Sequence, residues 1–353
     1  MAEDINAPSP PVPRKRRPRY AGKNPRHFQD KYKEHNPERY AETVAKVLSS
    51  GKTPAGSHRS IMVAEVLDVL APRPGEIAVD CTLGFGGHAQ ALLERIQPGG
   101  RLLGLDVDPV ELPRAEARLR ALGFGADVFT AVRSNFAGLA QVLAKAGLAG
   151  ADVILADLGV SSMQLDDPAR GFSIKHPGPL DMRMNPHRGQ PAAAWLQRVG
   201  AGDLEMLLRD NADEPHAAIL ARALAGKSFQ TTRALADAIR SAHPNLSHDA
   251  RELSIRRVFQ ALRIAVNDEF SALENFLRYL PLCLNPGGRV AILSFHSGED
   301  RRVKKAFEAG LHGGLYAGIS PEVIRPSLEE RHANPRSTPA KLRWAHRGNA
   351  QPR

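Results

Sequence analysis

Apolar runs of four to six residues alternate with stretches of helical spacing from about residue 61 onward. The apolar runs predict buried strands at 77–80, 101–106, 128–132 and 152–157. Apolar positions that recur every three or four residues predict helices between them, at 61–70, 89–96, 109–122 and 136–146. Such alternation predicts a parallel sheet with helices on its faces, and ligands of these sheets bind at the carboxyl ends of the strands.

The alternation is interrupted between Asp166 and about Ser254, where no good strand pattern occurs. Helical spacing there predicts helices at 192–196, 201–211, 217–225 and 232–242. The later elements expected are a helix at 255–280, a Pro-Gly-Gly turn at 286–288, an apolar run at 289–295 and a short strand at 341–346. We therefore expect an α/β domain with a helical insertion that serves as a lid or substrate platform. The expected organisation is an N-terminal arm at 1–57, an α/β domain in two parts at 58–165 and 255–347, the insertion at 166–254 and a tail at 348–353.

A glycine-rich turn follows the first expected strand and precedes a helix. Glycines let the backbone close against a ligand, and this arrangement is typical of nucleotide-cofactor sites. Asp106 follows about 20 residues later, where such folds hold a ribose hydroxyl. Asp80 stands beside the turn, where a carboxylate would repel a dinucleotide's pyrophosphate but can bind the cationic amino-acid end of S-adenosylmethionine. The pattern therefore favours a methyltransferase over a dehydrogenase.

Carboxylates end three of the expected strands, at Asp80, Asp106 and Asp157. Because the carboxyl ends of parallel strands meet at one edge of the sheet, these groups should lie close together and repel one another. We expect a bound ligand to relieve that repulsion.

The composition is that of a globular, basic protein. The 353 residues are 42% apolar, and 48 Lys and Arg stand against 38 Asp and Glu, which gives a net charge of +10 and favours an anionic partner such as nucleic acid. The two cysteines, Cys81 and Cys283, are expected to be buried thiols in a reducing compartment. No signal peptide or membrane-spanning run is visible, so we expect a cytoplasmic protein without a membrane partner.

The first 57 residues differ from the rest, because they hold twelve Lys or Arg against six Asp or Glu and a cluster of prolines. Such a composition cannot form a packed core. Two interpretations stay open, a solvated tail or an electrostatic arm that lies on RNA phosphates. One helix is expected at 38–48.

Seven blocks of the chain match a family pattern in order. They are DCTLGFGGH at 80–88, DLGVSSMQLD at 157–166, RGFS at 170–173, GPLDMRM at 178–184, FQALRIAVNDE at 259–269, SFHSGEDR at 294–301 and NPRS at 334–337. Together they resemble the bacterial small-subunit (16S) ribosomal RNA cytosine-N4 methyltransferases, the RsmH or MraW family. The resemblance runs from about His58 to Arg347, and the chain departs from it at 212–216, at 253–257 and at Gly298.

The resemblance implies a class I methyltransferase fold with a helical insertion and S-adenosylmethionine as methyl donor. Separately, His58, His88 and His296 are too dispersed for a recognisable metal-binding spacing, so no catalytic metal is expected. It implies a cytosine in the decoding region of small-subunit ribosomal RNA as acceptor, within the 30S particle. The cofactor contacts that it implies are Gly86, Gly87, His88, Asp106, Phe136, Asp157 and Gln164. Three questions stay open: which nucleotide is the target, whether the substrate is free RNA or an assembled subunit, and what the oligomeric state is.

The exocyclic amine of cytosine is a poor nucleophile, because its lone pair is delocalised into the ring. Many amino-methyltransferases place an Asp or Asn followed by Pro-Pro-aromatic after the fourth strand; here Asp157 is followed by Leu-Gly-Val. Asp157 either accepts a hydrogen bond from the amine, or serves the cofactor while a backbone carbonyl orients the base. Positioning supplies much of the rate in either case. Ser161, Ser162 and His296 are candidates for base contacts, with a structural role as the alternative for His296.

Arg183, Arg263 and Arg301 are candidates for RNA contacts, because a guanidinium suits both phosphates and bases. Their alternative is pairing within the protein, for example between Arg183 and Asp181 or between Arg301 and Glu299 or Asp300. Phe172 and Phe295 either stack on a flipped-out base or pack in the core.

Two rival functions fit parts of the pattern. A DNA amino-methyltransferase would share the cofactor site but is expected to carry Pro-Pro-aromatic after Asp157. A non-catalytic RNA-binding or assembly protein would not need the three carboxylates, and a titration with S-adenosylmethionine separates it from both enzymes.

Overall fold

The computed structural model describes residues 60–349. The arm, with its expected helix at 38–48, and the last four residues lie outside the described residues. A seven-stranded sheet forms the centre of the molecule, in the order β3-β2-β1-β4-β5-β7-β6. Neighbours from β3 to β5 are parallel, and β7 is antiparallel to both β5 and β6. The strands are β1 Ile77–Asp80, β2 Arg101–Asp106, β3 Phe129–Arg133, β4 Ala151–Asp157, β5 Leu284–Ser294, β6 Tyr316–Ile319 and β7 Lys341–Arg347.

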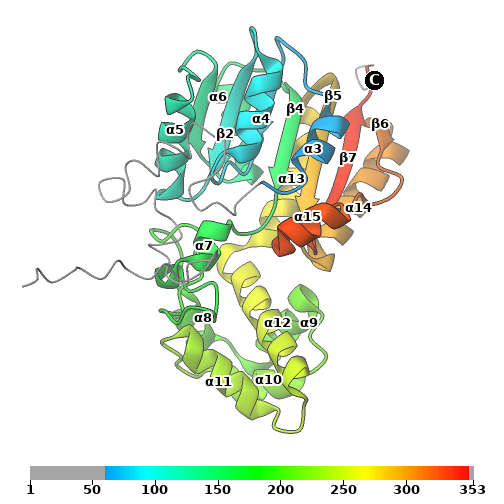
Figure 1. Ribbon diagram of the computed structural model, residues 1–353. Helices are drawn as coiled ribbons and strands as arrows, with labels where there is room; N and C mark the ends of the chain where they lie inside the picture. The colour runs from blue at the N-terminus through cyan, green and yellow to red at the C-terminus, as the bar shows by residue number, and fades with distance from the viewer. Residues whose placement is uncertain (1–59, 350–353) are drawn as a thin grey trace, which may run out of the picture.

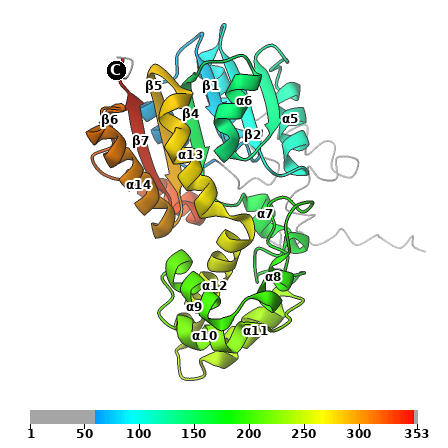
Figure 2. The ribbon, with the colours of Figure 1, turned by 180° about the vertical axis from the view of Figure 1, so that it is seen from behind.

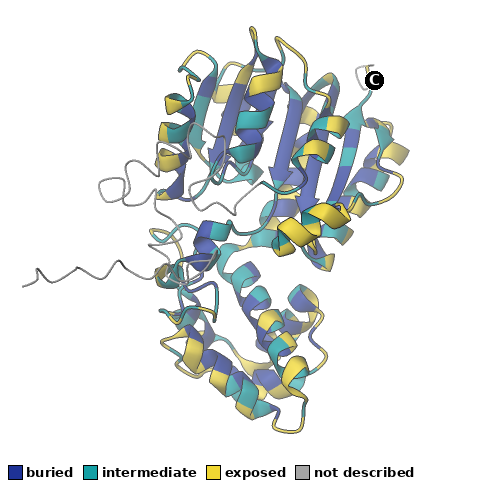
Figure 3. Cartoon of the chain, in the orientation of Figure 1, coloured by how far each residue is buried: buried dark blue, intermediate teal, exposed yellow. Residues whose placement is uncertain are grey.

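Helices cover both faces of the sheet, and the side chains of β4 show how. Val153 and Leu155 pack with the helices on one face, whereas Ile154 and Ala156 pack with those on the other. The first face carries α3 Val63–Leu70, α4 Gly87–Ile96 and α5 Glu111–Ala121, in front in Figure 1. The second carries α6 Leu139–Lys145, α13 Glu269–Cys283 and α14 Ser297–His312, in front in Figure 2. This two-sided burial makes the strands the darkest part of Figure 3, and the fold is the class I methyltransferase arrangement that the sequence predicts.

The helical insertion has a hydrophobic core of its own, built from residues between Phe172 and Leu262. It lies beyond the carboxyl ends of β4 and β5, towards which the strand arrows point in Figure 1. Its helices are α8 Ala192–Arg198, α9 Ala201–Ala212, α10 Ala217–Leu224, α11 Thr232–Ala242 and α12 His248–Asn267. All four helices expected between 192 and 242 are therefore confirmed to within a few residues.

The expected single helix at 255–280 is wrong, because two helices, α12 and α13, meet at Asp268. Asp268 has φ 51°, a left-handed conformation that Asp tolerates better than most residues. Helical periodicity continues across the junction and hides this break. The expected turn at 286–288 lies inside β5. Ala151 of β4 pairs with Leu284 of β5, but the next pair is Val153 with Arg289, so β5 has more residues than β4 between the two pairs. These additional residues form an irregularity of the bulge type.

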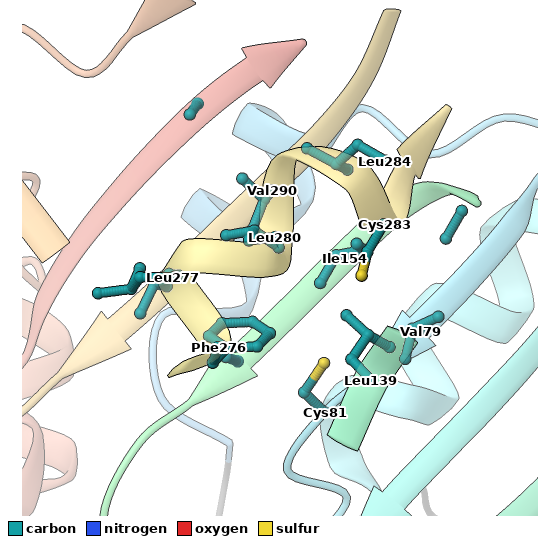
Figure 4. Close-up of a cluster of buried hydrophobic side chains, with 14 of the residues drawn as sticks. Val79, Cys81, Leu139, Ile154, Phe276, Leu277, Leu280, Cys283, Leu284 and Val290 are labelled. Atoms are coloured by element: carbon teal, nitrogen blue, oxygen red, sulfur yellow. The ribbon is translucent and has the colours of Figure 1, made fainter. Parts of the chain in front are cut away.

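Both cysteines are buried and free, as the sequence predicts, and they belong to one hydrophobic cluster (Figure 4). No helix within residues 60–349 is long and apolar enough to span a bilayer. Among these residues no group of three or more His, Cys, Asp or Glu is placed to hold a metal ion.

We expect Gly178→Ala to destabilise the protein by about 1–3 kcal/mol, the usual cost of overpacking. A Cβ at Gly178 would collide with the backbone carbonyl of Pro168, in the loop that connects the α/β domain to the insertion. Gly202→Ala is the matched control, because a Cβ there meets open space inside α9 and should be neutral or mildly stabilising. Urea unfolding of both variants tests this; equal midpoints for the two would contradict it.

Candidate active site

A cavity of about 1440 Å³ opens at the carboxyl ends of β1, β2 and β4. Its other walls come from the short helix α7 Ser162–Asp166, from α13 and from the segment 327–339. Small-molecule pockets typically measure roughly 300–1,000 Å³, so this one has room for a nucleotide cofactor and part of a second ligand. The sequence-predicted residues that line it are Gly86, Gly87, His88, Asp106, Phe136, Asp157, Ser161, Ser162, Gln164 and Arg263.

The glycine-rich turn after β1 is held from both sides. Asp106 accepts the Gly84 N–H through Oδ2 at 2.8 Å, and Gly86 caps α4 with φ 82°, a left-handed conformation that favours glycine. Behind the turn, the Arg118 guanidinium donates to the carbonyls of Phe85 and Gly86 at 2.9 and 2.7 Å. Burial lowers the pKa of Arg118 to about 10. The role of Arg118 could not be predicted from the sequence, since it lies in the last turn of α5 with no local motif that points to the glycine-rich turn.

Asp80 lies behind the cavity wall rather than on it. Its side chain is 1% exposed, and its Oδ1 accepts the Thr82 N–H at 3.1 Å. Burial raises the pKa of Asp80 to about 7, and the neighbouring Asp106 charge adds to the shift. Asp80 is not among the residues that line the cavity, and the cofactor contact expected for it stays a prediction. Its expected closeness to the other strand-end carboxylates is confirmed.

Asp157, at the end of β4, faces the cavity with an incompletely satisfied carboxyl group. Oδ1 is buried and has no hydrogen-bond partner among the described residues, and Oδ2 lies 3.7 Å from His88 Nδ1. Burial raises the pKa of Asp157 to about 8, with further contributions from the charges of Asp80 and Glu299. Such a group favours a cationic or hydrogen-donating ligand, which would supply the missing partner.

His88 is an uncharged neighbour of Asp157. Burial lowers the pKa of His88 to about 4, and its Nε2 lies 3.0 Å from the Ile61 carbonyl. Because a carbonyl can only accept, Nε2 carries the proton and the unprotonated Nδ1 faces Asp157.

We expect Asp157→Asn to stabilise the ligand-free protein, and the gain to grow with pH. The native pKa of Asp157 is raised above its unfolded value near 3.8, so between these values the folded state binds more protons and stability falls as pH rises. Asparagine removes this penalty, for a gain of at least about 1 kcal/mol at pH 8.5 and little change at pH 4. Chemical denaturation at both pH values measures it; a gain that does not vary with pH would contradict the assignment.

The side of the cavity nearest the insertion is built from the junction of α12 and α13. Arg263 donates Nε and Nη2 to the two carboxylate oxygens of Glu269, both at 2.9 Å. Asn267 accepts the Met184 N–H at 2.7 Å and donates to the Met182 carbonyl at 2.8 Å, which fixes the insertion's first segment against the cavity. Arg263 therefore reaches the site, but with its charge already paired.

Arg183 and Arg301, the other arginines considered for RNA contacts, do not line the cavity. Arg183 makes a two-pronged pair with Asp181 at 2.8 and 2.7 Å, as the alternative interpretation has it. Arg301 pairs with Asp213 at 3.3 Å rather than with its neighbours on α14. That ion pair joins the insertion to the α/β domain across 88 residues of sequence.

The remaining polar candidates have structural partners. The Ser161 hydroxyl accepts the Gln164 N–H while the Gln164 side chain accepts the Ser161 N–H, a capping box that begins α7. Gln164 also donates to the wholly buried Asp108 at 2.8 Å. His296 does not line the cavity; it caps α14, with Nε2 3.2 Å from Glu299, and the base contact expected for it stays a prediction.

The aromatic candidates differ in where they lie, either on the cavity wall or in a hydrophobic core. Phe136 and Phe295 line the cavity, and Phe136 also packs edge-on against Phe276 with ring centres 5.5 Å apart. Phe172 belongs to the core of the insertion and is 7% exposed, so it packs rather than stacks on a base.

The chain is similar in sequence to one family of known proteins. A model of the MraW methylase family matches residues 55–348. The protein "Ribosomal RNA small subunit methyltransferase H 2" of Alkaliphilus metalliredigens is 48% identical over 341 residues, which cover 94% of this chain and 97% of that protein. "Ribosomal RNA small subunit methyltransferase H 1" of Lachnoclostridium phytofermentans is 46% identical, with 94% and 92% covered. Among solved structures, an S-adenosylmethionine-dependent O-methyltransferase of Thermotoga maritima matches with a TM-score of 0.39 and 9% identity over 88% of this chain and 73% of that one.

Proposed function

This chain belongs to the MraW methylase family, and we propose that it methylates the exocyclic N4 amine of a cytosine in the decoding region of small-subunit ribosomal RNA. The observation that carries the proposal is the buried, unpaired Oδ1 of Asp157 at the wall of the cavity, where an amine can donate to it. The names of the relatives support ribosomal RNA as substrate.

S-adenosylmethionine is the methyl donor. The residues fit it, because Asp106 stands at the end of β2, where a ribose is held in such folds, and the cavity wall is rich in carboxylates that favour a cation. When bound, the donor supplies a methyl group on a positively charged sulfur, already activated for transfer. We assign the contacts to the glycine turn and His88, Asp106, Phe136, Asp157 and Gln164, while Asp80 acts through its charge.

Asp157 is the group that orients the nucleophile. A positive charge close by lowers the pKa of this carboxyl group from its raised value, so that Asp157 is ionised in the loaded site. Ionised Oδ1 would accept a hydrogen bond from the N4 amine, hold the amine in a fixed orientation and take up the proton that the amine loses. Alignment for in-line attack supplies the rest of the rate.

The insertion, whose helices are α8 to α12, is the RNA platform in this proposal. It lies beyond the strand ends at which the cavity opens, and Asn267 ties its first segment to the cavity wall. We assign base contacts to Ser161 and Ser162, which line the same cavity.

Transfer of labelled methyl groups from S-adenosylmethionine tests the function. We expect the protein to label small-subunit ribosomal RNA, and parallel reactions with free RNA and with assembled 30S particles show which of the two it uses. Binding of S-adenosylmethionine without labelling of either RNA substrate would favour a non-catalytic RNA-binding role. Labelling of DNA instead of RNA would favour a DNA amino-methyltransferase.

A further inference from the structure

The segment 327–339 closes one side of the cavity and is fastened at both ends. Within it, α15 Leu328–Ala333 lies at the carboxyl ends of the strands in Figure 1. Glu330 accepts the Met62 N–H at 2.8 Å beside α3, and Arg336 donates Nη2 to Asp166 Oδ1 on α7 at 2.6 Å. The segment thus joins elements on the cofactor and substrate sides of the site.

One buried donor group of Arg336 lacks a partner in the described part of the chain. Its Nη1 is buried and lacks a hydrogen-bond partner among the described residues, whereas the Asp166 side chain that holds Nη2 is 4% exposed. An unpaired guanidinium N–H that has been removed from water costs free energy until an acceptor is supplied. Because Arg336 lines the cavity, a ligand there can supply that acceptor.

The other cationic side chains on the described cavity wall are already engaged. Arg118 donates Nε, Nη1 and Nη2 to the Phe85 carbonyl, the Gln90 side chain and the Gly86 carbonyl. Arg263 is paired with Glu269, and no lysine lines the described wall. Carboxylates are plentiful on this wall, however, and include Asp106, Glu111, Asp157, Glu269, Glu299 and Glu330. An anionic group would be repelled over most of this surface, and Arg336 offers it a partner.

We propose that Arg336 binds an anionic oxygen of a ligand through Nη1, while Asp166 holds Nη2 and so fixes the plane of the guanidinium. This inference rests on the proposed function, whose two ligands each carry such an oxygen: the carboxylate at the amino-acid end of the cofactor and a phosphate of the RNA. A guanidinium recognises both through the same charge-assisted hydrogen bonds.

The test compares Arg336→Gln with Arg331→Gln, an exposed arginine on the same segment. Calorimetry uses S-adenosylhomocysteine, which has the carboxylate, and 5′-methylthioadenosine, which lacks the whole amino-acid end. Filter binding measures small-subunit ribosomal RNA over a range of salt concentrations. If the ligand oxygen is the carboxylate, Arg336→Gln weakens S-adenosylhomocysteine about tenfold and leaves 5′-methylthioadenosine unchanged. If it is a phosphate, RNA binding weakens and its salt slope flattens by about one unit, with both nucleosides unchanged.

Folded Arg336→Gln with wild-type affinity for all three probes would overturn the proposal. Equal losses for the two nucleosides without an effect on RNA would overturn it as well, because they indicate a distorted cavity. If Arg336→Gln does not fold, Arg336→Lys decides, since it keeps a cation for Asp166 but has no second Nη donor. The unmodified protein should bind both S-adenosylhomocysteine and RNA if the proposed function is right. Failure of the unmodified protein to bind them would contradict the proposed function, whereas an effect confined to Arg336→Gln concerns only the proposal for Arg336.

Discussion

Asp157→Ala should lower methyl transfer to ribosomal RNA at least about tenfold in a protein that remains folded, which corresponds to about 1.4 kcal/mol of lost transition-state stabilisation. The carboxyl group faces the cavity with one oxygen unpaired, and its removal leaves the amine without its acceptor. Removal of an unfavourably buried acid should not unfold the protein, because burial works against the ionised group. Single-turnover rates at saturating cofactor and RNA measure the effect.

Asp152→Ala is the matched control for this experiment. Asp152 also belongs to β4, but it lies near the opposite end of the strand, where it accepts hydrogen bonds from the Ile77 N–H and from Asn285 at 2.8 Å each. The control should lose stability and keep its rate of transfer. Near wild-type turnover of Asp157→Ala would instead assign the amine's acceptor to another group, such as a backbone carbonyl.

Asp106→Ala should weaken the binding of S-adenosylmethionine by about 1–3 kcal/mol, roughly 5- to 150-fold, the cost of leaving polar partners unpaired. Asp106 has two tasks in the structure, since Oδ2 holds the Gly84 N–H of the turn and Oδ1 holds the Asp108 N–H at 2.9 Å. Asp106 also lines the cavity, and each carboxylate oxygen can accept a further hydrogen bond, for example from a ribose hydroxyl. The substitution should therefore loosen the turn and remove the proposed ribose contact together.

Calorimetric titration with S-adenosylmethionine checks this prediction, with Asp106→Asn as the second variant. Asparagine keeps one oxygen for the turn but loses the charge and one acceptor, so its affinity should fall between those of the wild type and Asp106→Ala. Unchanged affinity in folded Asp106→Ala would refute the ribose assignment.

Much of the α/β domain was predictable because its strands are short apolar runs that end in a charged residue. The meeting of Asp80, Asp106 and Asp157 followed from the geometry of parallel strands, and β1, β2 and β4 are indeed neighbours in the sheet. The sequence could not distinguish a carboxylate on the wall from one behind it. That difference depends on how the turn after Asp80 folds over its own strand end.

Long-range pairs escaped prediction for a different reason. Arg336 and Asp166 are 170 residues apart, and Arg118 lies 33 residues from the Phe85 carbonyl that it holds. Hydrophobic periodicity indicates which face of a helix or strand is buried, but it does not indicate which distant residue a charged side chain on that element will pair with. The left-handed Asp268, too, is a local backbone state that the surrounding helical pattern conceals.

The most direct test of the proposed function is mass spectrometry of nucleosides from small-subunit ribosomal RNA of cells that lack this protein. We predict the loss of one N4-methylated cytidine from the decoding region, its return when the wild-type gene is supplied, and no return with Asp157→Ala. An unchanged set of methylated cytidines, or the loss of a methyl group from a different base, would contradict the account.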